Sequence, residues 1–381
     1  PHGLDAGVLM GAGRVSTRVD SVRGPHVLAT GLEPLQARLD VSTGRAVSES
    51  LVLQFDESLI PVDEWSPLAA MGQTLHVFVD VDLEDGTRFT VDRGWFLIQE
   101  VEPRSNGGVS VQAKGLMQRL KDDPFPFPSS PALNAGLRSE LERLCYPYLS
   151  VVLDGVEDRA LPGGLAWGRS RDEAVGALLS SFGLVGRVME DGALHVVKPD
   201  AGKVLARYGA DRLVLDASVK WSRRPNHWLA VGSKTESVKV DDKHHKSVKH
   251  EWWGEAWAGG AFDRSLYGVV TETVEAKAAV DQYDVDRLAG LSVRRFSPNG
   301  VKSFTMVPDY RVDLGDVISV GLSDGSVFVG SVSGFSMPLD GGTSTMRLDV
   351  EGAGGAVGGF EASASWERES FGERCCGAFC W

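Results

Sequence analysis

Two stretches far apart in this chain carry the same features in the same order. The first has Met71-Gly72, then Leu75 and Val77, the turn Asp85-Gly86-Thr87 and Phe89. The second has Leu314-Gly315, then Ile318 and Val320, the turn Asp324-Gly325-Ser326 and Phe328. Because Asp-Gly between two apolar runs is a hairpin signal, both stretches predict antiparallel β structure. Two unrelated hairpins are the alternative, but the shared order favours a duplicated β-domain.

The first copy lies in a region of predicted strands. Residues 75–81, 95–98 and 109–113 are rich in β-branched and aromatic residues, and Asn106-Gly107-Gly108 is a turn signal. We expect a small antiparallel barrel over residues 1–120. Four prolines between Asp123 and Pro131 then forbid a helix or a sheet interior and predict a stiff connector.

A change in the spacing of apolar residues, from strand-like to helix-like, marks a small α+β module within residues 121–204. Asn134 is the expected cap of a helix with Leu137, Leu141 and Leu144 on one face. Ser170 and Glu173 form a capping box for a second helix, and Gly183 suits its C-terminal end. A hairpin is expected around Asp191-Gly192.

The second half returns to strands. We expect a second barrel over residues 205–351, a long exposed loop from Lys239 to His250 and a helix from Thr273 to about Leu291. Residues 352–381 read as a glycine-rich linker and a tail. The predicted fold class is therefore mainly β with an α+β insertion: two related small β-barrel domains, a middle α+β module and a helix in the second half.

Charge and composition exclude several function classes. With 52 acidic and 39 basic residues the net charge is −13, which disfavours wrapping duplex DNA or stable adhesion to an anionic membrane. No apolar run approaches the roughly 20 residues of a membrane helix, and no secretory signal is visible. Four cysteines do not make a disulfide framework, so we expect assembly in a reducing cytoplasm.

Three clusters carry possible chemistry. The cluster of Trp252, Trp253 and Trp257 is expected either to pack in a core, to form a subunit interface or to bind sugars. His244, His245 and His250 stand among lysines, which favours a solvated loop over a metal site. Cys375, Cys376 and Cys380 either form a tail with reduced thiols or contribute to a metal or iron–sulfur site. We expect no catalytic, cofactor or metal site.

The motif Gly321-Leu-Ser323-Asp-Gly325 matches the G-x-S-x-G pattern of hydrolases. A nucleophile elbow needs a helix after the strand, whereas a second strand is expected here. The motif is therefore interpreted as a structural turn.

The order of these features resembles the hub protein of tailed-phage tails. This is the baseplate or tail-tip hub, often labelled minor tail protein in phages of actinobacteria, and it is similar in plan to the hub of contractile-tail phages and injection systems. The resemblance spans roughly residues 5–350, and its parts are residues 51–55, 65–68, 71–72, 85–86, 109–120, 171–175, 182–183, 191–199, 224–227, 276–288 and 314–320. It implies a trimer at the tube tip, two barrels per chain that continue the channel, and no catalysis.

A trimer of a duplicated chain presents six similar domains, so a three-fold object can join a six-fold one. The expected partners are tail tube and distal tail proteins, the tape measure protein, and tip, fibre or receptor-binding proteins, with DNA passing through without specific binding. The expected location is the tail tip of the virion. Two alternatives stay open: a host-envelope glycan hydrolase, which needs a pair of carboxylates, and a carbohydrate-binding module that uses the tryptophans.

Overall fold

The computed structural model describes residues 12–43, 45, 47–83, 86–105, 107–199, 204–209, 214–220, 223–239, 245–295, 300–322, 325–341 and 344–352. Strand is the predominant secondary structure of the described chain, as predicted. No helix among the described residues is long and apolar enough to cross a membrane.

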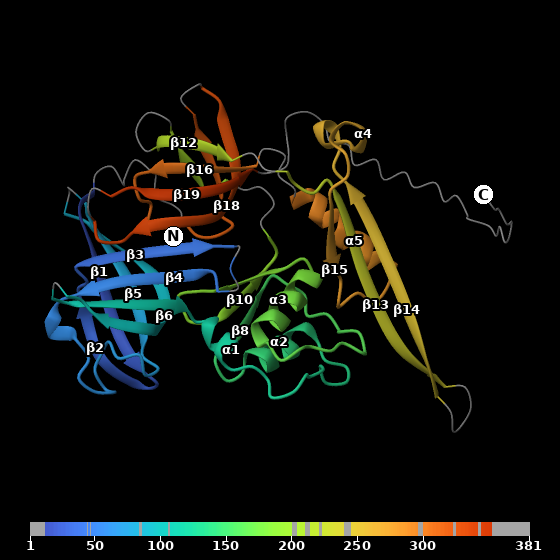
Figure 1. Ribbon diagram of the computed structural model, residues 1–381, viewed down its shortest axis with the longest axis horizontal. Helices are drawn as coiled ribbons and strands as arrows, with labels where there is room; N and C mark the ends of the chain where they lie inside the picture. Colours follow the sequence, from blue (N-terminus) through green and yellow to red (C-terminus); the bar gives the residue numbers. More distant parts are fainter. Residues whose placement is uncertain are drawn as a thin grey trace.

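The largest sheet has 13 strands, taken from both ends of the chain (Figure 1). Seven come from the first copy: β1 (Ala12–Arg23), β2 (His26–Leu32), β3 (Gln36–Ser42), β4 (Glu49–Phe55), β5 (Thr74–Leu83), β6 (Arg88–Pro103) and β7 (Val109–Gly115). Six come from the second: β11 (Ala206–Tyr208), β12 (Val214–Lys220), β16 (Val301–Met306), β17 (Val317–Gly321), β18 (Val327–Pro338) and β19 (Met346–Gly352). The single-residue alternation of buried and accessible positions in β3, β7 and β19 places one face of this sheet on the core.

The duplication is visible in the strand order. Five strands of the first copy run β3-β4-β7-β6-β5, and five of the second run β12-β16-β19-β18-β17, with every neighbouring pair antiparallel. The predicted Asp-Gly turns also match. Leu83 N donates to Thr87 O at 2.8 Å, and Leu322 N donates to Ser326 O at 2.8 Å. Gly86 and Gly325 have φ of 84° and 80°, where a side chain is disfavoured.

The two copies are not closed barrels, and this part of the sequence prediction is wrong. The ladders of the described residues form one open, branched sheet, because β18 of the second copy pairs with β3 of the first. One hydrophobic core correspondingly draws side chains from both copies, including Leu39 and Leu51 from the first and Phe335 and Leu348 from the second.

The segment after the first copy forms the expected small α+β module. It contains α1 (Gln118–Asp122), α2 (Leu137–Cys145), α3 (Arg171–Ser181) and a sheet of β8 (Val151–Asp154), β10 (Leu194–Val197) and β9 (Val185–Val188). Ser170 Oγ accepts from Glu173 N, as the capping box predicted. Asn134 does not cap α2: it has φ of 60°, and Gly136 is the cap residue.

A second insertion separates β12 from β16. It holds a sheet of β14 (His245–Trp257), β13 (His227–Lys239) and β15 (Thr271–Glu275), together with η3 (Gly260–Phe262), α4 (Arg264–Tyr267) and α5 (Gln282–Arg295). The short η2 (Glu57–Leu59) lies in the first copy. In Figure 1 the strands β13 and β14 form a long arm beside the rest of the molecule, with α5 on its inner side.

Two sequence predictions fail in this insertion. The helix expected from Thr273 is wrong, because residues 271–275 pair in parallel with β13 and the helix begins only at Gln282. The long loop from Lys239 to His250 is also wrong where it is described. Lys239 ends β13, and residues 245–250 belong to β14, directly opposite it.

The shared core predicts that both copies unfold together. Phe335 is 4% exposed on the strand that joins them, so Phe335→Ala should lower the free energy of unfolding by about 3–5 kcal/mol. Val327→Ala, at a 65% exposed position of the same strand, is the control and should change it by less than about 0.5 kcal/mol. Denaturant unfolding followed by fluorescence and circular dichroism would measure both. Separate transitions for the two halves would contradict the shared core.

Candidate assembly surfaces

The first surface is the junction between the two copies. Thr43 N donates to Ser333 O at 3.0 Å, and Leu339 N donates to Ala37 O at 2.8 Å, so these bonds bracket the ladder between β3 and β18. On the core side, Leu39 and Met337 lie opposite each other and are at most 1% exposed. The junction is therefore an ordinary sheet interior that joins chain segments almost 300 residues apart.

The other side of this junction is polar. Arg38 Nε donates to Ser336 Oγ at 3.0 Å and lies 3.4 Å from Asp40 Oδ1, while Ser336 Oγ donates to Asp40. The same trio recurs on neighbouring strands: Arg347 contacts Asp349 and Ser303, each at 3.0 Å, and Ser303 Oγ donates to Asp349. A shallow groove of about 440 Å³ lies between them.

A buried arginine ties the copies together a second time. Arg93 of β6, whose side chain is 6% exposed, reaches the loop before β17. Its Nη1 donates to Tyr310 O at 2.9 Å, and its Nη2 lies 3.1 Å from Asp313 Oδ1. Burial and, to a smaller extent, the Asp313 carboxylate raise the pKa of the neighbouring Glu49 to about 7, although Arg93 acts to lower it.

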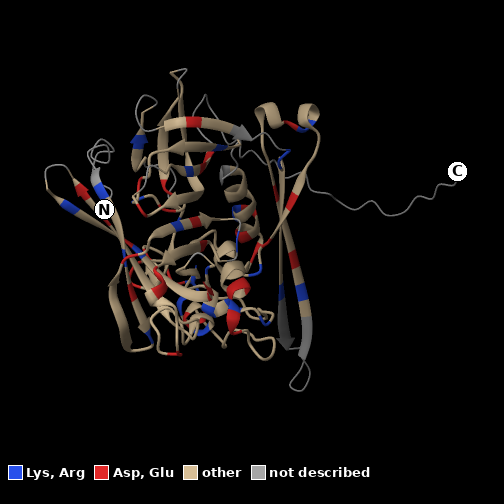
Figure 2. Ribbon diagram, turned by 60° about the vertical axis from the view of Figure 1, so that its left-hand side comes forward, with Lys and Arg blue, Asp and Glu red and all other residues tan. Residues whose placement is uncertain are grey.

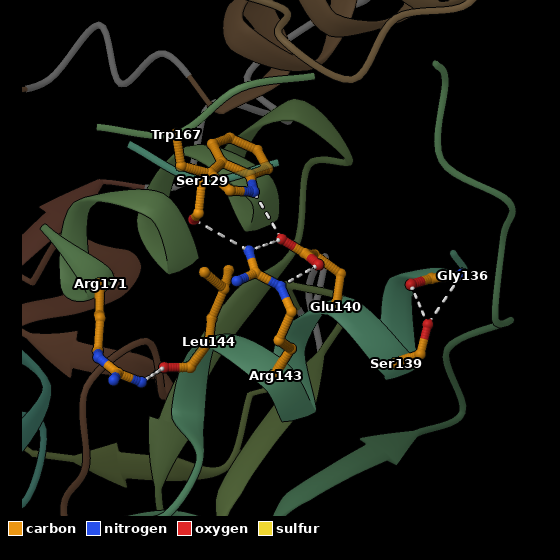
Figure 3. Close-up of polar contacts among 8 residues, drawn as sticks. All are labelled: Ser129, Gly136, Ser139, Glu140, Arg143, Leu144, Trp167 and Arg171. Carbon is orange, nitrogen blue, oxygen red and sulfur yellow. Dashed lines mark hydrogen bonds and ion pairs between the residues drawn. The ribbon is translucent and has the colours of Figure 1, made fainter. Parts of the chain in front are cut away.

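A buried carboxylate in the middle module is the strongest candidate for enzyme-like chemistry (Figure 3). Glu140 of α2 is 1% exposed. Its Oε1 accepts from the indole N–H of Trp167 at 2.6 Å, and both of its oxygens accept from Arg143, at 2.7 and 2.9 Å. Arg143 also donates to Ser129 Oγ at 3.3 Å. Since both oxygens are occupied by protein donors, Glu140 joins the proline-rich connector to α2 and Trp167.

The three clustered tryptophans separate onto two faces of β14. Trp252 packs against the small core beneath α5. Trp253 points to the other face and is 67% exposed, next to the 40% exposed Val231 on β13. Trp257 lies on the same face as Trp253 and stacks on His227, with ring centroids 3.9 Å apart. Trp252 is therefore a packing residue, whereas Trp253 belongs to an exposed surface.

The remaining predicted features are placed only in part. Cys375, Cys376, Cys380, residues 353–359 of the linker and His244 lie outside the described residues. His245 and His250 are in β14. Ser323 also lies outside, but the described parts of its motif join β17 to β18, so a strand follows it. Within the described ranges, no group of three or more potential ligand side chains could hold a metal ion.

Sequence reasoning missed the junction, Arg93 and Glu140. Nothing in residues 36–42 or 327–338 tells which strand each will join, because any edge with the right alternation can pair. The spacing of α2 could have identified Glu140 as buried, because it lies on the same helical face as the predicted core residues Leu137, Leu141 and Leu144.

Charge is not segregated over the residues that the structure describes. Acidic and basic residues are interspersed over the sheets and the middle module (Figure 2). Net charge alone therefore does not identify a surface that would face DNA.

Glu49 predicts a pH dependence of stability. Its folded pKa of about 7 lies above the ordinary value of 4.5, so the neutral form is favoured in the folded state. Its contribution is fully present below about pH 4.5 and is lost as the pH rises through about 7, with a total fall of about 3 kcal/mol. Glu49→Gln should remove this fall. Unfolding at a series of pH values measures it, and an unchanged slope in the variant would contradict the assignment.

Glu140 predicts a structural role that can be separated from general helix effects. Glu140→Gln leaves Arg143 without its charged partner and should lower the free energy of unfolding by about 2–3 kcal/mol. Glu142→Gln on the same helix is the matched control, because its side chain is 53% exposed; it should cost less than about 0.5 kcal/mol. Denaturant unfolding compares the two. Equal effects would show that the buried network adds nothing.

Comparison with solved structures places this arrangement among tail proteins, while no protein-family model and no curated protein sequence matches the chain. A tail protein from Neisseria meningitidis MC58 is similar with a TM-score of 0.60 and 15% identity, over 88% of this chain and 96% of that one. The 43 kDa tail protein of prophage MuSo2 from Shewanella oneidensis gives 0.54 and 12%, over 87% and 98%. Prophage tail protein gp18 from Listeria monocytogenes EGD-e gives 0.52 and 9%, over 87% and 94%. At these identities the shared property is the fold, and this chain has the fold of phage tail proteins.

Proposed function

We propose that this protein is a structural hub of a bacteriophage tail tip or baseplate. Three copies form a ring of six similar β-domains that continues or closes the tail tube. The observation that carries the proposal is the repeated five-strand order, joined into one sheet, in a chain with the tail-protein fold. A duplicated domain supplies the pseudo-six-fold surface that a trimer needs to meet a six-fold tube.

The partners follow from that position. The ring contacts tail tube and distal tail proteins on one side and tip, fibre or receptor-binding proteins on the other, and the tape measure protein and DNA pass through it. The protein is assembled in the host cytoplasm and becomes part of the virion. It performs no catalysis in this role, and its function needs no cofactor or metal.

One observation weighs against a glycan hydrolase, which needs a pair of accessible carboxylates. Glu140 is 1% exposed and accepts three hydrogen bonds from Trp167 and Arg143, so it is not accessible to a substrate. The described part of Gly321–Gly325 connects two strands and lacks the helix of a nucleophile elbow, which weighs against a serine hydrolase.

Carbohydrate binding is the second candidate function, and Trp253 is the observation that favours it. A tryptophan that is 67% exposed on a rigid strand presents a flat apolar face, which can stack on a sugar ring. Trp253→Ala should abolish binding to host cell walls if this candidate is correct. Trp252→Ala is not equivalent, because Trp252 packs under α5 and its loss affects folding.

The hub proposal predicts a trimer at the tail tip. Light scattering on the purified full-length protein should give three times the chain mass of 40.9 kDa. Labelled antibodies against the protein should bind phage particles at the tip of the tail in electron micrographs. A stable monomer, or label elsewhere on the particle, would overturn the proposal. Release of sugars or peptides from host cell wall by the isolated protein would favour the enzyme instead.

A further inference from the structure

We propose that β6 of one subunit pairs with β12 of the next, and so repeats between chains the junction that β18 and β3 make within the chain. This inference rests on the proposed trimer and adds the strands and the register that hold it together. Its occupant is a second copy of this chain.

The first open edge belongs to β6, which corresponds to β18. The N-terminal half of β6 pairs with β5, and that of β18 pairs with β17. Both strands then carry an irregularity at the same place, between Ile98 and Glu100 and between Val332 and Gly334. Beyond it, β18 pairs with β3, whereas no described strand pairs with that edge of β6.

The backbone of β6 offers hydrogen-bonding groups at this edge. Arg104 N donates to Gly108 O, toward β7, so strand alternation turns the N–H of Val101 to the open side. Phe335 occupies the corresponding position of β18, and its backbone groups face β3 in the same way. Gln99, Glu100 and Glu102 are exposed. Pro103 has no N–H to donate, so it limits the ladder at this end.

The second open edge belongs to β12, which corresponds to β3. Both pair on one side with the matching strand of their copy, β16 or β4. The other side of β3 joins β18, but within the described part of the chain β12 is the last strand of the sheet. In Figure 1 it lies at the top of the stack of strands, well away from β6. Each chain therefore has one complete junction and the two separate halves of another.

The internal junction fixes the register of the proposed contact. Ser336 lies opposite Asp40. Transferred through the matched ladders, these two backbone positions become Glu102 and Lys220. The reverse orientation of the strands would not bring these two positions opposite each other. An unpaired strand edge is also a liability for aggregation, which the ring removes.

Cross-linking tests this register. In a full-length background with Cys375, Cys376 and Cys380 changed to Ser, the double variant Glu102→Cys and Lys220→Cys is oxidised at the purified trimer concentration. Facing positions outside the hydrogen-bonded pairs bring Cα atoms within the distance a disulfide needs. Non-reducing electrophoresis should show the chain shifted to covalent dimers and trimers, and reduction should return it to 40.9 kDa.

Two matched controls show whether a cross-link reflects the proposed register or only random collisions between chains. Ser336→Cys with Asp40→Cys occupies the same register inside one chain and should form a disulfide without changing the mass. Glu102→Cys with Ser218→Cys shifts the register by two residues and should cross-link much less. Covalent trimers from the first pair alone support the proposal.

Other outcomes overturn it in distinguishable ways. A trimer by light scattering that yields no cross-link with Glu102→Cys and Lys220→Cys, while the internal control forms its disulfide, would overturn this contact and leave the hub intact. A monomer by light scattering would overturn the hub and the contact together. A cross-linked ladder that extends beyond three chains would contradict ring closure.

Discussion

The antiparallel ladder between β18 and β3 is the interaction on which the architecture depends. Each copy of the β-domain alone is a small sheet with exposed edges, and exposed edges bind other strands indiscriminately. Pairing these two strands satisfies the backbone groups of both and merges two half-cores into one, with Leu39, Val41, Phe335 and Met337 buried at the seam. Arg93 adds a second link between the copies, since it reaches Tyr310 and Asp313 of the second copy.

The insertions lie where that framework tolerates them. The middle module connects the two copies, and the arm with α5 connects β12 to β16, so neither interrupts a ladder of the large sheet. Each has its own core, and they touch where Ala278 enters the core of the middle module. In the proposed ring the large sheet serves assembly, whereas the exposed face around Trp253 lies on a separate sheet. The buried polar network around Glu140 holds the proline-rich connector in place.

Local patterns predicted the elements whose partners are near in sequence. The N-cap bond of Ser170, the turn at Gly192 and the hairpins at Gly86 and Gly325 depend on interactions within a few residues, and all are present. Thr273 shows the limit of this reasoning. A threonine before an apolar run can cap a helix, but residues 271–275 form a parallel strand because β13 lies beside them. The same limit applies to the loop predicted from Lys239 to His250, because residues 245–250 belong to β14 through backbone pairing with β13.

The sequence by itself determined the fold class, the duplication and its turns, because hydrophobic alternation and glycine conformations act locally and repeat when a gene segment repeats. Only the tertiary structure decided that the copies merge instead of closing as barrels, and that Trp252 and Trp253 part onto opposite faces. Each strand can pair with any edge of matching alternation, so its partner depends on the arrangement of the whole fold and not on its own sequence. This arrangement leaves β6 and β12 with open edges among the described strands, and these edges meet the neighbouring chain in the proposed ring.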